Sequence, residues 1–257
     1  MNSAAQEVAA YAAYPSLRDR VVFITGGASG IGAAMVEAFH GQGARVAFVD
    51  KARGAGQALA ARLPGSWFRL CDVTYPAALQ SAVDAAAWAL GPITVLVNNV
   101  ADDAHHPALG LSPEAWRRGL AVNLDPAFIT STRVAPAMAA AGGGTIINLG
   151  SINALLPTAE MPDYVAAKGA ISALTKSLAR EWGVSGIRVN AIMPGWVVTA
   201  RHLATWLTPE LEAEWMMKTC LKHRILPDDV ARAALFLAAD DSRMITGQDF
   251  IIDGGRI

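Results

Sequence analysis

Short runs of consecutive apolar residues alternate along the chain with longer stretches of helical pattern. The runs are rich in β-branched residues and do not alternate with polar ones, which is typical of strands buried on both faces. The expected strands are residues 20–25, 44–50, 67–73, 93–100, 144–151, 187–193 and 248–253. The expected helices are residues 30–42, an alanine-rich helix ending at 62, then 76–90, 112–140 with a bend near Pro126, 162–184, a helical excursion over 199–223, and 227–238.

Strands that are each followed by a helix indicate a parallel sheet covered on both faces. The pattern therefore predicts an α/β fold, with a single doubly wound domain of seven parallel strands spanning residues 1–257. Residues 1–19 are interpreted as an N-terminal extension and not as a signal peptide, because no basic segment precedes an apolar core. In such sheets ligands bind beyond the carboxyl ends of the strands, so the candidate chemistry is sought there.

Composition narrows the function classes. The chain has 257 residues, a net charge of −1 and 53% hydrophobic residues, enough for a substantial core. The chain has no strongly basic stripe, so a nucleic-acid partner is not expected. No apolar stretch approaches the roughly 20 residues of a membrane span. Cys71 and Cys220 form no metal-ligand pattern and suggest no disulfide framework, so no metal is expected and a cytoplasmic location fits.

The stretch "TGGASGIG", residues 25–32, joins the first expected strand to the first helix and holds four glycines. Glycines allow a tight turn and let a pyrophosphate approach the backbone N–H groups at a helix start. Gly26, Gly30 and Gly32 form the pattern, and the Ser29 hydroxyl offers a further contact. The loop indicates a dinucleotide site, although a ligand-free glycine turn would read the same in isolation.

Asp50 ends the second expected strand and follows Gly30 by 20 residues, the spacing typical of an acid that binds the adenosine ribose. A carboxylate there accepts hydrogen bonds from both ribose hydroxyls and repels a 2′-phosphate. NAD is therefore expected in preference to NADP, while Lys51 and Arg53 lie nearby and weaken that preference.

The stretch "YVAAK" places Tyr164 and Lys168 on one face of the helix expected at 162–184. An ammonium beside a phenol stabilises the phenolate, which would lower the pKa of Tyr164 from about 10. Ser151 ends the preceding strand, where it could donate to a reacting oxygen or simply cap a turn. Asn123 lies inside a helical run, where it could interrupt the helix and hold a water, or lie on a solvated face.

Together these stretches make the chain resemble the single-domain short-chain dehydrogenases/reductases over nearly its whole length. The matching stretches are "TGGASGIG", "CDV", "NNVA", "AVNL", Ser151 with "YVAAK", "MPGWVVT" and "TGQDFIIDGG". The resemblance implies a Rossmann-type fold, a nicotinamide cofactor, hydride transfer at a carbinol carbon, and a homotetramer. One departure is "NNVA" in place of the usual NNAG, which puts Val100 and Ala101 in that loop.

The resemblance also implies residue roles. Asn123, Ser151, Tyr164 and Lys168 would form the catalytic tetrad. The cofactor would be held by Gly26, Ser29, Gly30, Ile31, Gly32, Asp50, Asp72, Val73, Asn99, Tyr164, Lys168, Pro194, Val197 and Thr199. Within this set, Asp72 and Val73 would flank the adenine and Asn99 would lie along the cofactor. The nicotinamide end would be held by Pro194, Val197 and Thr199.

Two variable segments are candidates for choosing the substrate. The loop "ADDAHH", residues 101–106, is unusually polar, and the segment from about 195 to 225 is expected to form a substrate lid that carries three tryptophans. Flat aromatic faces with carboxylates and amides suit a sugar ring, although each residue could equally pack or be solvated. The expected substrate contacts are Asp103, His106, Ser151, Asn153, Tyr164, Trp196 and Trp206.

A narrower resemblance joins the segment from "TWLTPE" to "MITGQ" to bacterial aldose 1-dehydrogenases of the D-xylose type, in which the first loop reads like NDDRH. Oxidation of a free aldose to a lactone is the function implied. The alternatives are a short-chain dehydrogenase acting on a cyclic alcohol, a polyol or a 3-oxoacyl thioester, and a dinucleotide-binding protein without turnover.

Overall fold

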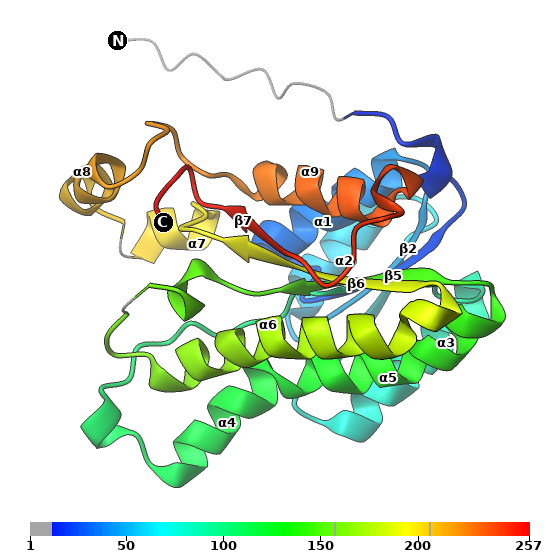
Figure 1. Cartoon of the computed structure of the whole chain (residues 1–257), viewed down its shortest axis with the longest axis horizontal. Coiled ribbons are helices and arrows are strands. Elements are labelled where there is room, and N and C mark those ends of the chain that lie inside the picture. The colour runs from blue at the N-terminus through cyan, green and yellow to red at the C-terminus, as the bar shows by residue number, and fades with distance from the viewer. Residues whose placement is uncertain (1–11, 157, 206) are drawn as a thin grey trace.

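The computed structural model describes residues 12–156, 158–205 and 207–257. Its centre is a seven-stranded, wholly parallel sheet in the order β3-β2-β1-β4-β5-β6-β7 (Figure 1). The predicted α/β class is confirmed. The strands are β1 Val21–Thr25, β2 Arg45–Asp50, β3 Trp67–Leu70, β4 Val95–Asn98, β5 Gly144–Leu149, β6 Ile187–Pro194 and β7 Asp249–Ile252.

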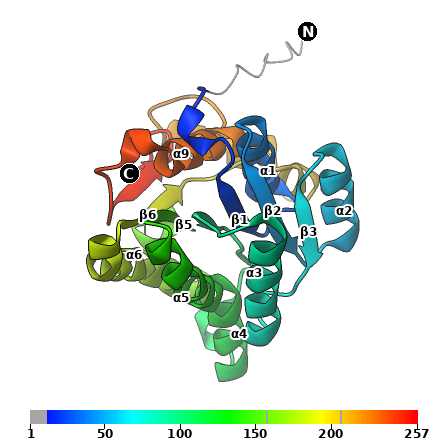
Figure 2. The same ribbon diagram turned by 90° about the vertical axis from the view of Figure 1, so that its right-hand side faces the viewer.

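Helices cover both faces of the sheet, as Figure 2 shows end-on. One layer holds α1 and α9, which pack against each other, and α2. The other holds α3, α5 and α6, with α4 packed on α6. The bounds are α1 Gly30–Gly41, α2 Arg53–Arg62, α3 Pro76–Leu90, α4 Pro113–Asn123, α5 Asp125–Ala140, α6 Pro162–Trp182, α7 Ala200–Thr205, α8 Pro209–Met217 and α9 Pro227–Ala238.

Two hydrophobic clusters fill the space between the sheet and its helices. Phe23 of β1 and Met138 of α5 are fully buried in the cluster under α3 and α5, and Phe48 of β2 is fully buried in the cluster under α1 and α9. Along β1, Val22 and Ile24 belong to one cluster and Val21 and Phe23 to the other, so adjacent positions of one strand face different layers and both are buried. This explains why the strands read as continuous apolar runs.

The sheet order reverses direction beside β1, which lies between β2 and β4. At such a switch point the loops after the two central strands turn away from each other and open a crevice. The glycine stretch follows β1 and the "NNVA" stretch follows β4, so both flank this crevice.

The expected helix over residues 112–140 is wrong in one respect, since it is two helices that meet at Leu124. Leu124 has φ −128° and ψ −56°, outside helical geometry, and the Asn123 side chain is drawn into hydrogen bonds with the main chain of Asp102. Pro126 does not bend a continuous helix but lies in the first turn of α5, where its fixed φ is favourable.

Other boundaries also differ from expectation. The expected excursion over 199–223 contains the short helices α7 and α8, and its last residues are not helical. β3 ends at Leu70 and β4 at Asn98, so Asp72 and Asn99 lie in loops beyond the strand ends. These residues are thereby placed at the ligand edge of the sheet.

The end of the expected N-terminal extension packs on the domain. Leu17 is fully buried, and the Tyr14 N–H donates to the Gln42 side chain at 2.7 Å.

None of the helices in the described ranges is long and apolar enough to cross a membrane.

Candidate active site

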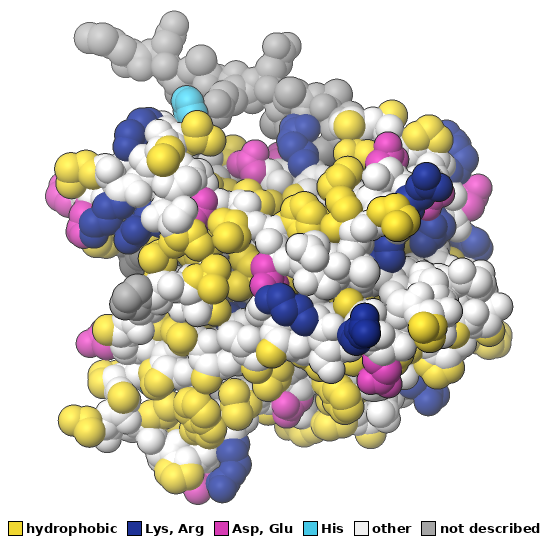
Figure 3. Space-filling view, in the orientation of Figure 1, with side chains coloured by type: hydrophobic (Ala, Val, Ile, Leu, Met, Phe, Trp, Pro, Cys, Tyr) yellow, Lys and Arg dark blue, Asp and Glu magenta, His cyan; other side chains and the backbone are white. Residues whose placement is uncertain are grey.

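A cleft of about 1370 Å³ runs along the carboxyl edge of the sheet. At one end, here the glycine-loop end, it is lined by the loops after β1, β2 and β3. At the other end, the lid end, it is lined by α4, the loop after β4 and the lid segment, residues 195–225. Its volume exceeds the roughly 300–1,000 Å³ of drug-sized ligand pockets, which leaves room for a dinucleotide and a second molecule. In Figure 3 this edge lies at the left.

The backbone of the glycine loop packs so closely against itself and against Val100 that Gly26 and Gly32 leave no room for a side chain. A Cβ on Gly32 would lie 1.9 Å from the Gly26 carbonyl oxygen, and one on Gly26 would lie 2.9 Å from Val100 Cγ2. Gly26 and Gly30 also have φ of +67° and +53°, the left-handed region that favours glycine. Ser29 precedes α1 as its N-cap and makes no side-chain cap bond, so its hydroxyl is left for other contacts. Ile31 follows in the first turn and lines the cleft.

Asp50 and Asn99 fix this loop from either side. The Asp50 carboxylate accepts from the Ala28 N–H at 3.0 Å and from the Ala52 N–H at 2.9 Å. The Asn99 amide donates to the Thr25 and Gly26 carbonyls, both at 3.0 Å. Asn99, expected along the cofactor, therefore also holds the glycine loop in shape.

Asp72 and Val73 line the glycine-loop end of the cleft. The Asp72 carboxylate accepts from the Thr74 N–H at 3.0 Å and from its hydroxyl at 2.7 Å. The Thr74 backbone bond and then its side-chain bond lower the pKa of Asp72. The buried Val73 side chain offers an apolar surface beside this exposed carboxylate.

Tyr164 and Ser151 both line the cleft. Burial raises the pKa of Tyr164 to about 12, although the neighbouring Ser151 hydroxyl opposes the rise. The expectation that the neighbouring ammonium lowers the pKa of Tyr164 is therefore wrong for the protein without bound cofactor. Desolvation of the phenolate raises this pKa and outweighs the other influences. The Ser151 Oγ also accepts from the Asn153 N–H at 3.1 Å.

Lys168 is buried one helical turn beyond Tyr164. Its Nζ donates to the Leu149 carbonyl at 2.6 Å and lies 5.6 Å from the Tyr164 ring centroid. Burial lowers the pKa of Lys168 to about 8, with the Asp103 carboxylate opposing the fall. At pH 7 most of the side chain is still charged, so a buried cation lies beside the phenol.

Asn123, the last residue of α4, is 3% exposed. Its Oδ1 accepts from the Asp102 N–H at 2.8 Å and its Nδ2 donates to the Asp102 carbonyl at 3.0 Å. The reading of Asn123 as a surface residue is excluded by this burial. The paired bonds tie the loop after β4 to α4, and so fix the stretch that carries Asp103.

Asp103 reaches across the cleft to the lid segment. It forms an ion pair with Arg201 of α7, and its Oδ2 lies 3.9 Å from His202 Nε2. The neighbouring His202 imidazole, followed by Arg201, holds the pKa of Asp103 well below its usual value, against the effect of burial. His202 Nδ1 is 2.8 Å from the Val197 carbonyl oxygen, so one imidazole joins both walls.

Other expected substrate contacts line the same end. His106 is exposed, with its main-chain N–H 2.5 Å from the Glu160 carbonyl oxygen, and Asn153 contacts Met161 Sδ at 3.4 Å. Trp196 faces Trp215 with ring centroids 5.5 Å apart in an edge-on arrangement. Trp206 lies outside the described residues.

The residues expected at the nicotinamide end follow β6 directly. Pro194 ends the strand, Val197 pairs with Ile225 in an isolated bridge, and Thr199 comes within 3.4 Å of a Cβ position on Gly30. The segment after β6 thus closes onto the glycine loop. All three residues line the cleft.

The fold and the cleft are shared with known proteins. The sequence model of a family described as enoyl-(acyl carrier protein) reductase matches residues 26–256. A solved structure from Sinorhizobium meliloti 1021, provisionally assigned as a short-chain alcohol dehydrogenase, superposes with a TM-score of 0.87 at 28% identity, covering 94% of this chain and 98% of that one. The chain belongs to the short-chain dehydrogenase/reductase family. It is thus an oxidoreductase of a family that acts on CH–OH groups with nicotinamide cofactors.

Several relatives of this oxidoreductase have names that state a substrate. A probable galactose dehydrogenase of Rhizobium meliloti (strain 1021) is 46% identical over 94% of this chain and 96% of its own. A D-xylose 1-dehydrogenase of Caulobacter vibrioides (strain NA1000 / CB15N) is 41% identical over 95% and 98%. A D-threitol dehydrogenase of Mycolicibacterium smegmatis (strain ATCC 700084 / mc(2)155) is 40% identical over 93% of each.

Among the cleft residues that the sequence did not single out as contacts are Asp163 and Arg256. Arg256 follows β7, and residues just beyond strand ends were already the expected site of ligands, so its position was a usable signal. Asp163 had none, because its place depends on how α6 packs, and Trp215 was indicated only as one of the three tryptophans of the lid segment. No group of three or more metal-binding side chains occurs in the described ranges.

Proposed function

We propose that this short-chain dehydrogenase/reductase oxidises a free aldose, in its pyranose form, at the anomeric hydroxyl to a lactone, with NAD as the oxidant. The observation that carries the proposal is the grouping of Ser151, Tyr164 and Lys168 in one cleft, with a lid end whose walls combine carboxylate, imidazole and indole groups. The galactose and D-xylose names of its relatives support a sugar.

The glycine-loop end fits a dinucleotide. Close packing within the loop leaves no room for a Cβ on Gly26 or Gly32, and the N-terminus of α1 favours the negative charge of a pyrophosphate. NAD is the proposed form because the Asp50 carboxylate is held toward the loop by two N–H groups. A 2′-phosphate at that position would meet this negative charge.

The proposed chemistry follows from the side chains. NAD, when bound, supplies a hydride acceptor. Ser151 donates a hydrogen bond to the anomeric oxygen and Tyr164 accepts its proton as the C1–H bond breaks and the carbonyl forms. Lys168 supplies positive charge beside the phenolate and binds the cofactor ribose. Asn123 keeps an N–H beyond its bond to Asp102, which would support a water on the route of the proton to solvent.

The substrate contacts are proposed on the same basis. The C–H face of a pyranose would pack on Trp196, while Asp103, His106 and Asn153 would fix the hydroxyl pattern. Trp206 is kept as a proposed contact. We also propose a cytoplasmic homotetramer, as the family resemblance implies.

The test measures NAD reduction with D-galactose and D-xylose, their 1-O-methyl glycosides and their alditols. The aldoses should turn over, the glycosides should be inert because they have no anomeric hydroxyl, and the alditols should be poor because they have no ring. Faster turnover of an alditol than of every aldose would reject the lactone-forming reaction. It would favour polyol oxidation, which the D-threitol dehydrogenase relative makes the second candidate.

A second assay tests the cofactor by comparing kcat/KM for NAD and NADP in the wild type and in Asp50→Asn. The wild type should prefer NAD, and removal of the charge should narrow the preference by about tenfold, a change of about 1.4 kcal/mol. Equal or better use of NADP by the wild type would mean that Lys51 or Arg53 overrides Asp50.

A further inference from the structure

Arg256, the penultimate residue, brings an uncompensated cation to the lid end of the cleft. Its side chain is partly buried and lines the cleft, and its Nε is wholly buried with no hydrogen-bond acceptor in the described part of the chain. An N–H withdrawn from water without an acceptor is unfavourable, and more so when the group is charged. The guanidinium therefore keeps hydrogen-bonding capacity that the described residues do not use.

The carboxylates nearest along the chain have other partners. Asp253 accepts from the Gly255 N–H at 2.7 Å and from the Ile257 N–H at 3.0 Å, which shapes the turn that presents Arg256. In the lid segment, Glu214 pairs with Lys218 and Glu212 pairs with Arg224. The guanidinium is therefore not neutralised by the acids of its own wall.

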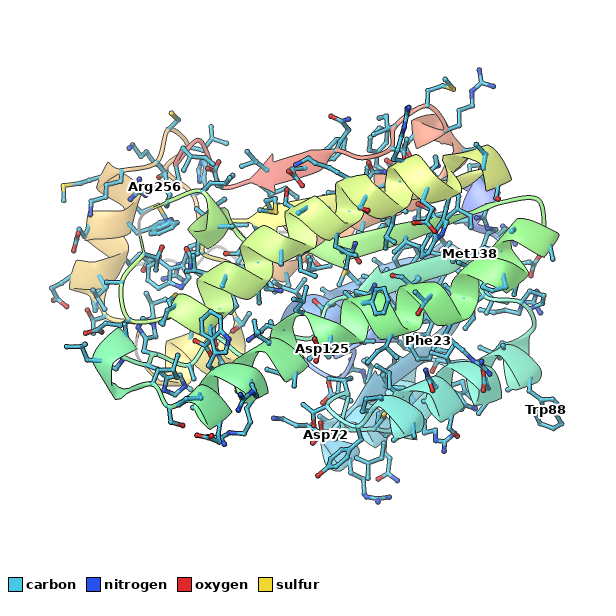
Figure 4. The ribbon with its side chains drawn as sticks, turned by 60° about the horizontal axis from the view of Figure 1, so that its bottom comes forward. Phe23, Asp72, Trp88, Asp125, Met138 and Arg256 are labelled. Atoms are coloured by element: carbon cyan, nitrogen blue, oxygen red, sulfur yellow. The ribbon has the colours of Figure 1, made fainter. Side chains whose placement is uncertain are left out.

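Two tryptophan rings in contact link Arg256 to other residues that line the cleft. The guanidinium carbon lies 5.5 Å from the centroid of the Trp215 ring, over its face, and Trp215 contacts Trp196 edge-on. Trp215 also packs against the buried cluster that contains Ile152, the neighbour of Ser151. Figure 4 shows Arg256 at the upper left, near the amber helix α8, and Asp72 well away from it at the lower edge. Arg256 therefore belongs to the lid end, on the Ser151 side.

We propose that Arg256 forms an anion subsite, so that the preferred substrate carries a carboxylate or phosphate on the part of the sugar remote from the anomeric carbon. This inference rests on the proposed function, because it deepens the substrate class of the same site. A planar guanidinium can bind either oxyanion through two parallel N–H···O bonds. Trp215 would hold the plane in place while the Trp196 edge limits the space for the ring.

The kinetic test compares kcat/KM for D-galacturonate, D-galactose 6-phosphate and D-galactose in the wild type, Arg256→Met and Arg256→Lys. Methionine keeps an unbranched stem against Trp215 but removes the charge. The wild type should prefer one anionic sugar over galactose by at least about tenfold, since charge-assisted bonds contribute about 1.5–3 kcal/mol. Which of the two anionic sugars is preferred distinguishes a carboxylate ligand from a phosphate.

In Arg256→Met the preference should disappear, so that kcat/KM for the three sugars differs by less than about threefold. Arg256→Lys should recover only part, because an ammonium cannot make the paired bonds. Arg118→Met is the matched control, since Arg118 is an exposed cation of α4 that lines the lid end of the same cleft. It should keep the preference. Equal loss for all three sugars in Arg256→Met, or a wild type that prefers galactose, would overturn the subsite.

A binding measurement separates this proposal from the oxidation itself. Methyl α-D-galacturonide has no anomeric hydroxyl, so it cannot be oxidised there. Calorimetry with NADH present should show that it binds the wild type more tightly than methyl α-D-galactoside, and that Arg256→Met removes the difference. This result would support the subsite even if no aldose is oxidised, and equal binding of the two glycosides would reject it even if aldoses are substrates.

Discussion

The glycine-loop end of the cleft is shaped by main chain, whereas the lid end is shaped by side chains from distant segments. At the first, the Gly26 carbonyl lies 1.9 Å from a Cβ position on Gly32, and Asn99 binds two loop carbonyls. At the second, Asp103 pairs with Arg201, which lies 98 positions further along the chain. The first end depends on glycine at fixed places, and the second depends on the identity of single charged residues.

The difference has a consequence for specificity. A backbone cradle recognises groups common to every dinucleotide and tolerates almost no substitution. At the lid end, one residue of an ion pair can be substituted without displacing the sheet, because each half-exposed ion pair contributes only about 0–1 kcal/mol to stability. Relatives of similar fold can therefore carry the names of galactose, D-xylose and D-threitol dehydrogenases.

The largest expected effect lies where the two ends meet. Tyr164→Phe removes the proposed proton acceptor and leaves the helix and both ends of the cleft in place. Turnover should fall by about 10³-fold, within the usual range for loss of acid–base catalysis, while NADH affinity stays within about threefold. Steady-state kinetics and NADH fluorescence check this. Turnover within tenfold of the wild type would remove Tyr164 from its assigned role.

The glycine-loop end is broken by Gly32→Ala. The new Cβ would collide with the Gly26 carbonyl at 1.9 Å and approach the Asn99 amide at 2.7 Å, so the loop must shift. Cofactor affinity should fall by at least about hundredfold, the equivalent of roughly 2.7 kcal/mol.

Gly41→Ala is the control for this substitution. Gly41 ends the same helix, α1, and nothing lies within 4 Å of its Cβ position. Its Tm should stay level or rise and its NADH affinity should not change. Titration of NADH into both variants gives the comparison, and similar affinity for the two would show that the loop yields easily.

The sequence could predict the glycine-loop end because its signals are local. Gly26, Gly32 and Asp50 have fixed spacings around one strand–helix turn, and the same holds for Tyr164 and Lys168 within one helix. The alternation of strands and helices likewise predicted the sheet. The spacing could not reveal the sign of the Tyr164 pKa shift, because desolvation depends on everything packed around the ring.

The lid end could be predicted only in part. Asp103 and Trp196 were singled out by type, but their partners Arg201 and Trp215 are fixed by tertiary packing that no local pattern records. The break at Leu124 was indicated only as one alternative for Asn123 and as a bend near Pro126, since its position depends on a hydrogen bond from Asn123 to a loop about 20 residues earlier.

Lys168→Met sharpens the comparison through pH. Because the pKa of Lys168 is lowered to about 8, the unfolded chain binds more protons than the folded one between pH 8 and about 10.4. The wild type should thus gain stability from this residue as pH rises from 8 to 9.5, by at most about 1 kcal/mol per unit, and the variant should lack that gain.

Urea unfolding of both proteins at pH 7, 8 and 9.5 measures the difference, in which all other titrating groups cancel. The variant should also lose turnover at each pH. A constant difference in unfolding free energy across the range would show that Lys168 titrates at its ordinary pKa and that its burial does not penalise the charge.

The smallest expected effect is at the ion pair that closes the lid end. Arg201 and Asp103 are 59% and 38% exposed, so Arg201→Met should cost less than about 1 kcal/mol of stability and leave Tm nearly unchanged. Because the pair joins the loop after β4 to the lid segment, the sugar KM should rise by about two- to fivefold with kcat and NAD affinity maintained. Arg224→Met is the matched control, since the Arg224–Glu212 pair also holds the lid segment but neither residue lines the cleft. If both variants raise the sugar KM equally, the effect comes from general loosening of the lid segment. If only Arg201→Met does, the side chains facing the cleft set sugar affinity while the backbone cradle at the other end is unaffected.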